Sequence, residues 1–193
     1  MKIQNVAAVY PRWTRQPQAW QKHFWQIVVR VDSDLGISGL GYGGGGPPAV
    51  EVVNRHLRHV IDGCRVDSID DISRAWDRMY RQSLPYGRRG IAMMALSGVD
   101  LALWDLFAKA SNLPVYELLG GIRKTSIRAY ATTYGRDRFE QCRDFGYTAV
   151  KFGAPDPQQT TDVEEATRTA ARLRTLLGPD AMIMADYYMA WDI

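Results

Sequence analysis

Two ionisable side chains stand where apolar runs end in the second half of the sequence. Lys151 lies within TAVKFG, residues 148 to 153, and Asp186 closes AMIMAD, residues 181 to 186. A lysine there can neutralise a carboxylate, act as a base, or simply face solvent at a strand end. An aspartate there can cap a helix, satisfy a polar group or bind Mg²⁺, which prefers hard oxygen ligands. If both end neighbouring parallel strands, we expect them to converge on one edge of the sheet.

The histidines give a weaker signal. His56 and His59 are three residues apart in a predicted helix, a spacing that can chelate a metal. Arg55 and Arg58 flank them, and no acidic or cysteine partner accompanies them. A solvated basic face is therefore the favoured interpretation, and no histidine general base is apparent.

Other polar patterns favour structural roles. Asp100 and Asp105 lie five residues apart in a predicted helix and point in different directions, so we expect hydrogen bonding or capping. The run GYGGGG, residues 41 to 46, lacks the context of a nucleotide-binding loop. Cys64 and Cys142 form no CxxC pattern, which favours free thiols in a reducing cytoplasm.

Composition narrows the class of protein. The 193 residues, 46% of them hydrophobic, suffice for one core or for a small domain plus part of another. The net charge of +3 is spread along the chain, so we expect no nucleic-acid partner. We find no secretory signal and no run near the roughly 18 apolar residues of a membrane helix. The sequence thus predicts a cytoplasmic protein without a membrane partner.

Two arrangements of elements must position these residues. The first 120 or so residues predict an α+β domain with an antiparallel meander followed by helices. Its strands are expected at residues 3 to 9, 24 to 32 and 37 to 43, and its helices at 48 to 61, 69 to 81 and 90 to 111. The helix at 90 to 111 is apolar almost all round and should be buried.

From residue 126 strands and helices alternate, which predicts βα units and a parallel sheet. Its strands are expected at residues 127 to 133, 148 to 153 and 181 to 186, and its helices at 136 to 145 and 161 to 177. The sequence stops after the third of these strands, so we expect a fragment of a longer protein.

A long segment resembles a known family. GIAMMALSGVDLALWDLFAKASNLPVYELLGG, residues 90 to 121, is similar to the segment leading into the barrel in the mandelate racemase and muconate-lactonising branch of the enolase superfamily. The resemblance covers essentially the whole chain. It implies a capping domain over residues 1–122 and the first three strands of a (β/α)₈-type barrel over residues 123–193.

The resemblance also implies roles for the two residues. Asp186 matches the first metal-ligand carboxylate of the family, and Lys151 matches the first lysine of its KxK motif. Gly153 stands where the second lysine would be, which argues against two-base racemisation and favours a histidine base on the seventh strand, beyond this sequence. Tyr188 and the following Trp191-Asp192 resemble the rhamnonate dehydratase group.

The implied reaction is dehydration of a sugar acid. In that group Mg²⁺ binds the substrate carboxylate and stabilises an enediolate after loss of the α proton, and departure of the β-hydroxyl leaves a 2-keto-3-deoxy acid. The capping loops supply specificity, and we expect them at residues 11 to 23 and 41 to 48. The candidate substrate-binding residues there are Arg12, Trp13, Arg15, Trp20 and His23. Relatives form symmetric assemblies, so we expect a homo-oligomer.

Two alternatives stay open. One is another proton-abstraction reaction of the superfamily, such as epimerisation, racemisation or cycloisomerisation. The other is a truncated, non-catalytic relative that serves in binding or assembly, because the sequence contains one of the usual three metal carboxylates.

Overall fold

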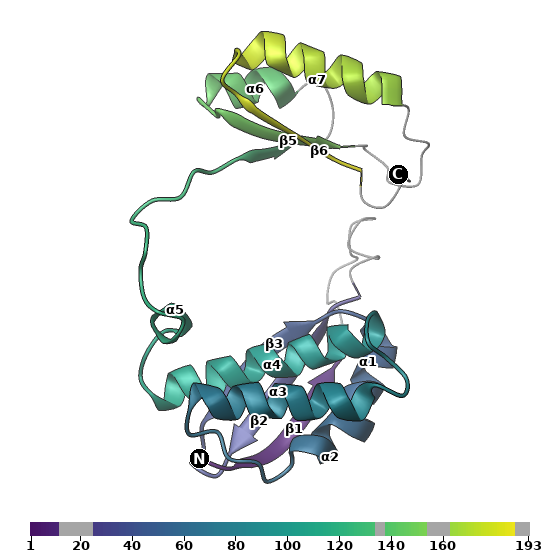
Figure 1. The fold of residues 1–193 in the computed structure, drawn as a ribbon, viewed down its shortest axis with the longest axis vertical. Helices are drawn as coiled ribbons and strands as arrows, with labels where there is room; N and C mark the ends of the chain where they lie inside the picture. The colour runs from purple at the N-terminus through teal and green to yellow at the C-terminus, as the bar shows by residue number, and fades with distance from the viewer. Residues whose placement is uncertain (12–24, 134–137, 154–162, 188–193) are drawn as a thin grey trace. The chain divides into compact units, whose positions relative to one another are not determined.

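The computed structural model describes residues 1–11, 25–133, 138–153 and 163–187. The chain divides into two compact units, Met1–Arg123 and Lys124–Ile193. Figure 1 shows their elements. Each unit has its own cluster of buried apolar side chains, so each is held together by contacts of its own.

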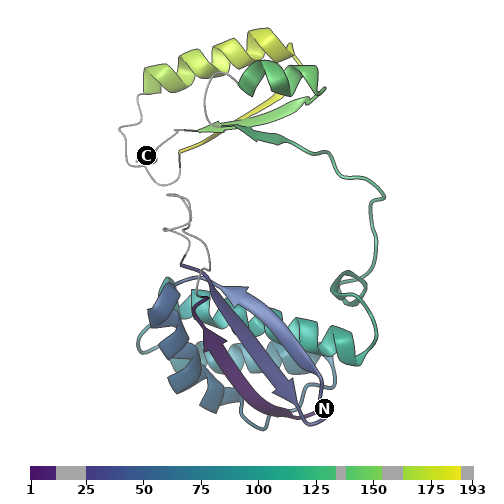
Figure 2. The same ribbon diagram turned by 180° about the vertical axis from the view of Figure 1, so that it is seen from behind.

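Alternating β-branched residues build the sheet of the first unit. Strands β1 (Ile3–Val9), β2 (Ile27–Ser33) and β3 (Ser38–Gly43) pair antiparallel in the order β1-β2-β3, which confirms the predicted meander. Val29 and Val31 of β2 are fully buried, while Val28 is exposed, because successive side chains of a strand point to opposite faces. Figure 2 shows the helices gathered on one face of this sheet.

The helical part of the first unit contains a π-helical turn that the sequence did not predict. Its helices are α1 (Gly46–Val52), the π-helical segment η2 (Val53–Leu57), α2 (Arg58–Ile61), α3 (Ile69–Ser83), α4 (Ile91–Ala110) and α5 (Val115–Leu118). Within η2, Asn54 Oδ1 accepts from the Ala8 amide at 2.8 Å and Asn54 Nδ2 donates to the Ala8 carbonyl at 3.0 Å. The Asn54 side chain therefore bonds both backbone groups of Ala8 at the outer edge of β1, as a neighbouring strand would.

Helix α4 lies with its backbone directly against strand β3. Gly39, Gly41 and Gly43 alternate along the strand, and all three face the helix. A Cβ at Gly41 would stand 2.3 Å from the Gly98 carbonyl oxygen, and a Cβ at Gly43 would stand 2.3 Å from that of Met94. The helix can lie this close to the strand only because these three strand residues have no side chains. This explains why the glycine run begins inside the strand.

The burial of α4 corrects two expectations. Ile91, Met94 and Leu101 expose 42%, 47% and 42% of their surface, so the helix is buried on one side rather than all round. By length and composition α4 would qualify as a membrane-spanning segment. The expectation that no stretch of this sequence is long and apolar enough for a membrane helix is therefore wrong. Half of the qualifying stretch is buried inside the structure, as in the core helix of a globular unit.

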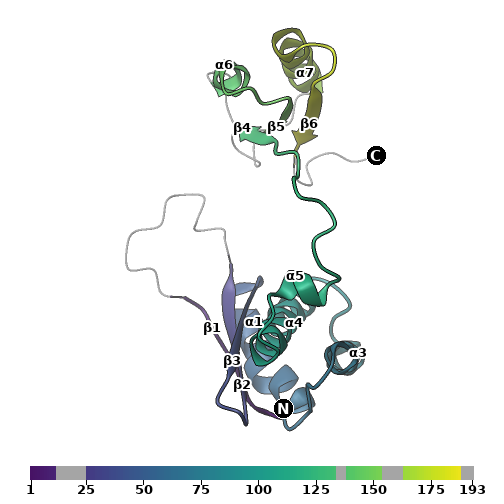
Figure 3. The same ribbon diagram turned by 90° about the vertical axis from the view of Figure 1, so that its left-hand side faces the viewer.

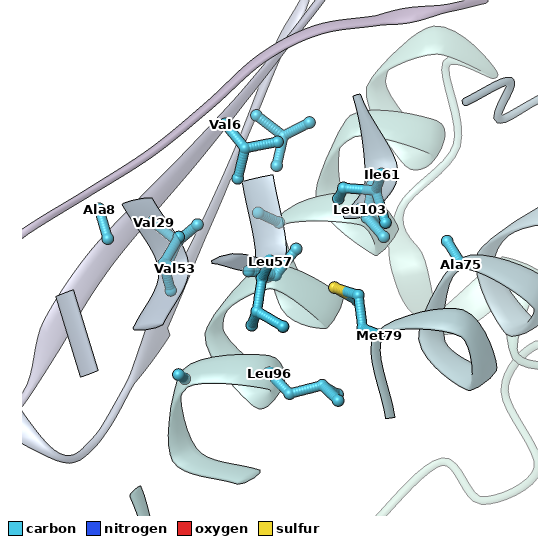
Figure 4. Packing of buried hydrophobic residues seen from close by; sticks show 14 of the residues in the cluster. Val6, Ala8, Val29, Val53, Leu57, Ile61, Ala75, Met79, Leu96 and Leu103 are labelled. Atoms are coloured by element: carbon cyan, nitrogen blue, oxygen red, sulfur yellow. The ribbon is translucent and has the colours of Figure 1, made fainter. Parts of the chain in front are cut away.

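The core of the first unit lies between the sheet and its helices. Figure 4 shows Val6 and Val29 of the sheet among side chains from the helices, including Leu57, Met79 and Leu103. All five are completely buried. Side chains from η2, α3 and α4 thus join strand residues in one cluster.

Strands and helices alternate in the second unit. It contains β4 (Ala131–Thr133), α6 (Phe139–Asp144), β5 (Ala149–Gly153), α7 (Val163–Leu177) and β6 (Met182–Asp186). The strands pair parallel in the order β4-β5-β6, which confirms the predicted parallel sheet. The first strand is shorter than predicted, since the paired residues begin at Ala131. Figures 1 and 3 show α6 and α7 on the same side of this sheet.

Candidate functional site

The two faces of the second sheet carry different side chains. Val150 and Phe152 of β5 are buried in one cluster with Phe139 of α6 and Leu173 of α7. Lys151 lies between them in the strand, so its side chain leaves the opposite face. This face, without α6 and α7, is where a parallel sheet can present polar groups to a ligand.

The structure brings the two predicted residues, Lys151 and Asp186, together. Lys151 lies beside Met184 in the register of β5 and β6, and Asp186 follows two residues later on the same face, beside Gly153. Nζ of Lys151 donates to Oδ2 of Asp186 at 2.9 Å. Their side chains are 24% and 34% exposed, so the ion pair is partly buried at the carboxyl ends of neighbouring strands.

Gly153 is the neighbour of this ion pair in the sheet. The register puts Gly153 directly beside Asp186, two residues beyond Lys151 on the same face. Because Gly153 has no side chain, the position where the family motif has its second lysine adds no second charged group beside the pair.

Tyr130 is a site residue that the sequence analysis missed. The ammonium of Lys151 lies 5.8 Å from the centroid of the Tyr130 ring, within the range of a cation–π contact. Thr132 of β4 pairs with Lys151 in the register, and Tyr130 lies two residues earlier. Alternate residues of a strand lie on the same face, so Tyr130 shares the face of Thr132 in the predicted strand. Its place beside Lys151 could therefore have been inferred from the sequence.

The donor set of this face suits Mg²⁺. Asp186 supplies a hard, partly exposed carboxylate oxygen, and Mg²⁺ is commonly held by one or two carboxylates while it keeps several waters. Within the described residues no group of three or more His, Cys, Asp or Glu side chains could hold a metal ion. Among the described residues, Asp186 therefore offers one of the carboxylate ligands that the family resemblance implies.

His56 has a partner of its own. Its Nδ1 lies 2.6 Å from the hydroxyl of Tyr86, and the two rings meet edge to face at 5.4 Å. The contact gives His56 a structural partner in the first unit, which the sequence did not predict.

The two helical aspartates have different surroundings. Oδ2 of Asp105 accepts from the backbone amide of Leu40 at 2.7 Å and from Nζ of Lys109 at 2.6 Å, so this carboxylate satisfies the edge of β3. The side chain of Asp100 is withdrawn from water, and this burial raises the pKa of its carboxyl group. The predicted hydrogen-bonding role is confirmed for Asp105.

The candidate substrate-binding residues cannot be placed in this site. Arg12, Trp13, Arg15, Trp20 and His23 lie in residues 12–24, outside the described residues. Tyr188 and Trp191-Asp192, which carry part of the family resemblance, lie outside them too. Their roles remain predictions.

Comparison with known proteins gives consistent matches. The family model described as mandelate racemase / muconate lactonizing enzyme, N-terminal domain, matches residues 4–120. L-rhamnonate dehydratase of Saccharopolyspora erythraea is 34% identical over 195 residues, covering 99% of this chain and 48% of that protein. A protein of Caldivirga maquilingensis provisionally named L-rhamnonate dehydratase is 34% identical over 196 residues, covering 99% and 47%. The chain spans about half the length of these curated relatives.

Solved structures agree with this grouping. A member of the enolase superfamily from a Polaromonas species is 28% identical with a TM-score of 0.78, and the match covers 100% of this chain and 53% of that one. A mandelate racemase/muconate lactonizing protein of Paracoccus denitrificans, solved with magnesium, is 29% identical with a TM-score of 0.73, over 96% and 51%. The chain belongs to the mandelate racemase / muconate lactonizing enzyme family of the enolase superfamily.

Proposed function

We propose that this protein is a Mg²⁺-dependent dehydratase of a sugar acid, a carbon–oxygen lyase. The observation that carries the proposal is the ion pair of Lys151 and Asp186 at the carboxyl ends of β5 and β6. It supports the proposal, because an ammonium and a carboxylate at one edge of a parallel sheet suit a substrate carboxylate and a metal ion. The similarity to proteins named L-rhamnonate dehydratase supports the choice of reaction.

Lys151 neutralises the substrate carboxylate and so acidifies the neighbouring C–H bond. When a base removes the α proton, the electron pair of that bond moves into the carboxylate and gives an enediolate. The ammonium stabilises the added negative charge more strongly than it stabilises the ground state, which lowers the barrier. The bond from the β carbon to its hydroxyl then breaks, the hydroxyl leaves as water with a proton from an acid, and the enol becomes a 2-keto-3-deoxy acid.

The metal would be held by Asp186. Bound Mg²⁺ supplies Lewis-acid stabilisation of the carboxylate charge that develops during proton removal. All three histidines, His23, His56 and His59, precede the second unit, which begins at Lys124. A histidine base, as the family resemblance implies, is therefore expected on a later strand than β6.

A second candidate is another proton-abstraction reaction of the superfamily. A 3,6-anhydro-D-galactonate cycloisomerase of Zobellia galactanivorans is 26% identical with a TM-score of 0.69, which favours this alternative. Gly153 in place of a second lysine disfavours two-base racemisation. Incorporation of solvent deuterium at the α carbon without loss of water would distinguish these reactions from dehydration.

Two further properties stay predictions. We propose a homo-oligomer, because relatives in this family form symmetric assemblies, and sedimentation of the purified protein would measure its size. We also propose a cytoplasmic location, which the two free cysteines, Cys64 and Cys142, suit.

The deciding experiment is a substrate screen, with Mg²⁺, of the longer protein that includes the later barrel strands, because we expect the described part of the barrel to be inactive alone. Sugar acids, beginning with L-rhamnonate, are incubated with the protein, and 2-keto-3-deoxy acid is measured as its semicarbazone. We expect turnover with at least one acid, its loss in Asp186→Asn, and its retention in Asp180→Asn, which changes an acid at the other end of β6. Absence of both turnover and Mg²⁺ binding would favour a binding or assembly role instead.

A further inference from the structure

The π-helical turn η2 is an unusual element of the first unit, and its polar side chains bond neighbouring segments. Such turns are rare and occur frequently at functional sites. Figure 4 shows Val53 and Leu57 of η2 among the core side chains, and both are completely buried. Between them, Asn54 bonds strand β1 and His56 bonds Tyr86. The turn is therefore fixed between the core and two segments distant in sequence.

This turn holds one end of the β1–β2 connection, which we define as residues 10–26. Asn54 accepts from the amide of Ala8 at 2.8 Å and donates to the carbonyl of Ala8 at 3.0 Å. Ala8 lies one residue before β1 ends at Val9. One side chain thus bonds both backbone groups of Ala8, and this fixes where the connection leaves the sheet.

The other end of the connection is held by the start of the same helical segment. Trp25 lies two residues before β2 begins at Ile27, and its carbonyl accepts from the amide of Gly46 at 2.8 Å. The ring of Trp25 lies directly against this glycine, because a Cβ at Gly46 would stand 3.0 Å from the ring. Gly46 begins α1, and α1 runs directly into η2 at Val53. One helical segment therefore contacts both ends of the connection.

We propose that Asn54 is a positioning residue for substrate selection, because it sets where the β1–β2 connection leaves β1. The inference rests on the proposed function, in which Arg12 and Trp20 of this connection contact the sugar acid. Asn54 acts through the backbone of Ala8 and does not touch the substrate itself. A displacement of about 1 Å, caused far from the chemistry, can change a rate constant about a hundredfold. Loss of the Asn54 contact should therefore change which sugar acid fits best.

Steady-state kinetics of the longer protein test the proposal with the sugar acid that it converts best and with an epimer of that acid. In Asn54→Ala, the ratio of kcat/KM between the two acids should change about fivefold or more, with a smaller change in the kcat of the better one. Asn54→Asp keeps an acceptor for the Ala8 amide but loses the donor to the Ala8 carbonyl. Its ratio should lie between that of Asn54→Ala and that of the unchanged protein. An unchanged ratio in Asn54→Ala would overturn the proposal.

Asn5→Ala is the matched control, because Asn5 lies on the same strand and its side chain also forms a hydrogen bond. Its Nδ2 donates to Oδ2 of Asp32 at 3.1 Å, toward the start of β1 and away from the connection. We expect Asn5→Ala to lower Tm without changing the ratio of kcat/KM. The same change of ratio in Asn5→Ala and Asn54→Ala would mean that lost stability sets the ratio, and this too would overturn the positioning role.

A double-mutant cycle shows whether Asn54 acts through the connection. Once Trp20→Ala is present, Asn54→Ala should change the ratio much less, whereas full additivity of the two changes contradicts the proposal. If Asn54→Ala fails to fold, Asn54→Asp replaces it in each measurement, and an unchanged ratio in Asn54→Asp is then the overturning result. If the unchanged longer protein converts no sugar acid, the proposed function and this inference both fail. If it converts sugar acids and the Asn54 variants keep its ratio, only this inference fails.

Discussion

At the scale of single residues, Tyr130 shows how an unreactive side chain can matter to the proposed chemistry. Its ring faces the ammonium that we expect to meet the substrate carboxylate. Replacing Tyr130 with Leu removes the ring, so Lys151 loses a favourable contact, and we expect kcat/KM to fall about two- to fivefold. Steady-state kinetics of Tyr130→Phe, which keeps a ring, should give nearly the unchanged value. Equal losses in both variants would show that the hydroxyl rather than the ring is important.

The residues proposed to choose the substrate belong to the same scale. Arg12 and Trp20 offer a charged donor and an aromatic face suited to a polyhydroxy acid. In an active enzyme, Arg12→Ala or Trp20→Ala should change the ratio of kcat/KM between sugar acids more than the kcat of the best one. Unchanged ratios would remove residues 11 to 23 from the proposed specificity loops.

At the scale of elements, the contact between β3 and α4 leaves no space for a methyl group. The Cβ of Gly41→Ala would stand 2.3 Å from a backbone carbonyl oxygen, so strand and helix must move apart. We expect the free energy of unfolding in urea to fall by about 2 kcal/mol or more. Gly44→Ala is the control, since its nearest neighbour is the flexible side chain of Met94, at 3.1 Å. A similar loss in both would contradict the argument from backbone contact.

The start of α3 gives a prediction about pH. The hydroxyl of Ser68, then the guanidinium of Arg74 and the backbone amide of Asp67, lower the pKa of Asp71 from 3.8 to about 2. The ionised carboxylate therefore favours the folded state above pH 3.8, and this contribution disappears as the pH falls toward 2. Asp71→Asn should lower Tm at neutral pH. The difference in Tm between the variant and the unchanged protein should become smaller as the pH falls from 3.8 toward 2. A Tm difference that stays the same down to pH 2 would contradict this explanation.

Most elements could be predicted from the sequence because their patterns are local. Alternation around Val29 marks a strand, and the apolar run before Asp186 marks another. The π-helical turn at Val53–Leu57 could not be predicted, because its apolar pattern is that of an ordinary helix and its Asn54 contacts a strand distant in sequence. The aromatic contact of Tyr130 was missed for a related reason, since it depends on strand register rather than on a motif.

At the scale of the whole molecule, the two units differ in how much core each has. The cluster of the first unit joins β1 and β2 to η2, α3 and α4, whereas that of the second is a small set around Phe152. We expect residues 1–123 made alone to unfold in one cooperative thermal transition. Residues 124–193 made alone should lack one, because a small cluster cannot offset chain entropy. Calorimetry of the two pieces checks this, and a cooperative transition in the second piece would contradict it.

The π-helical turn has a consequence for how this chain can vary. Deleting one residue between Val53 and Leu57 would restore an ordinary helix and leave the residues beyond it facing nearly as before, because a π-helical turn holds one more residue than an α-helical turn. Leu57, Val60 and Ile61 would then stay in the core, provided that Asn54 keeps its contact with Ala8. Loss of one residue from α1 or α2 would instead rotate everything beyond it by about 100° and turn core side chains toward solvent. Relatives would therefore be expected to differ in length by one residue within Val53–Leu57 before they do so within the flanking α-helical turns.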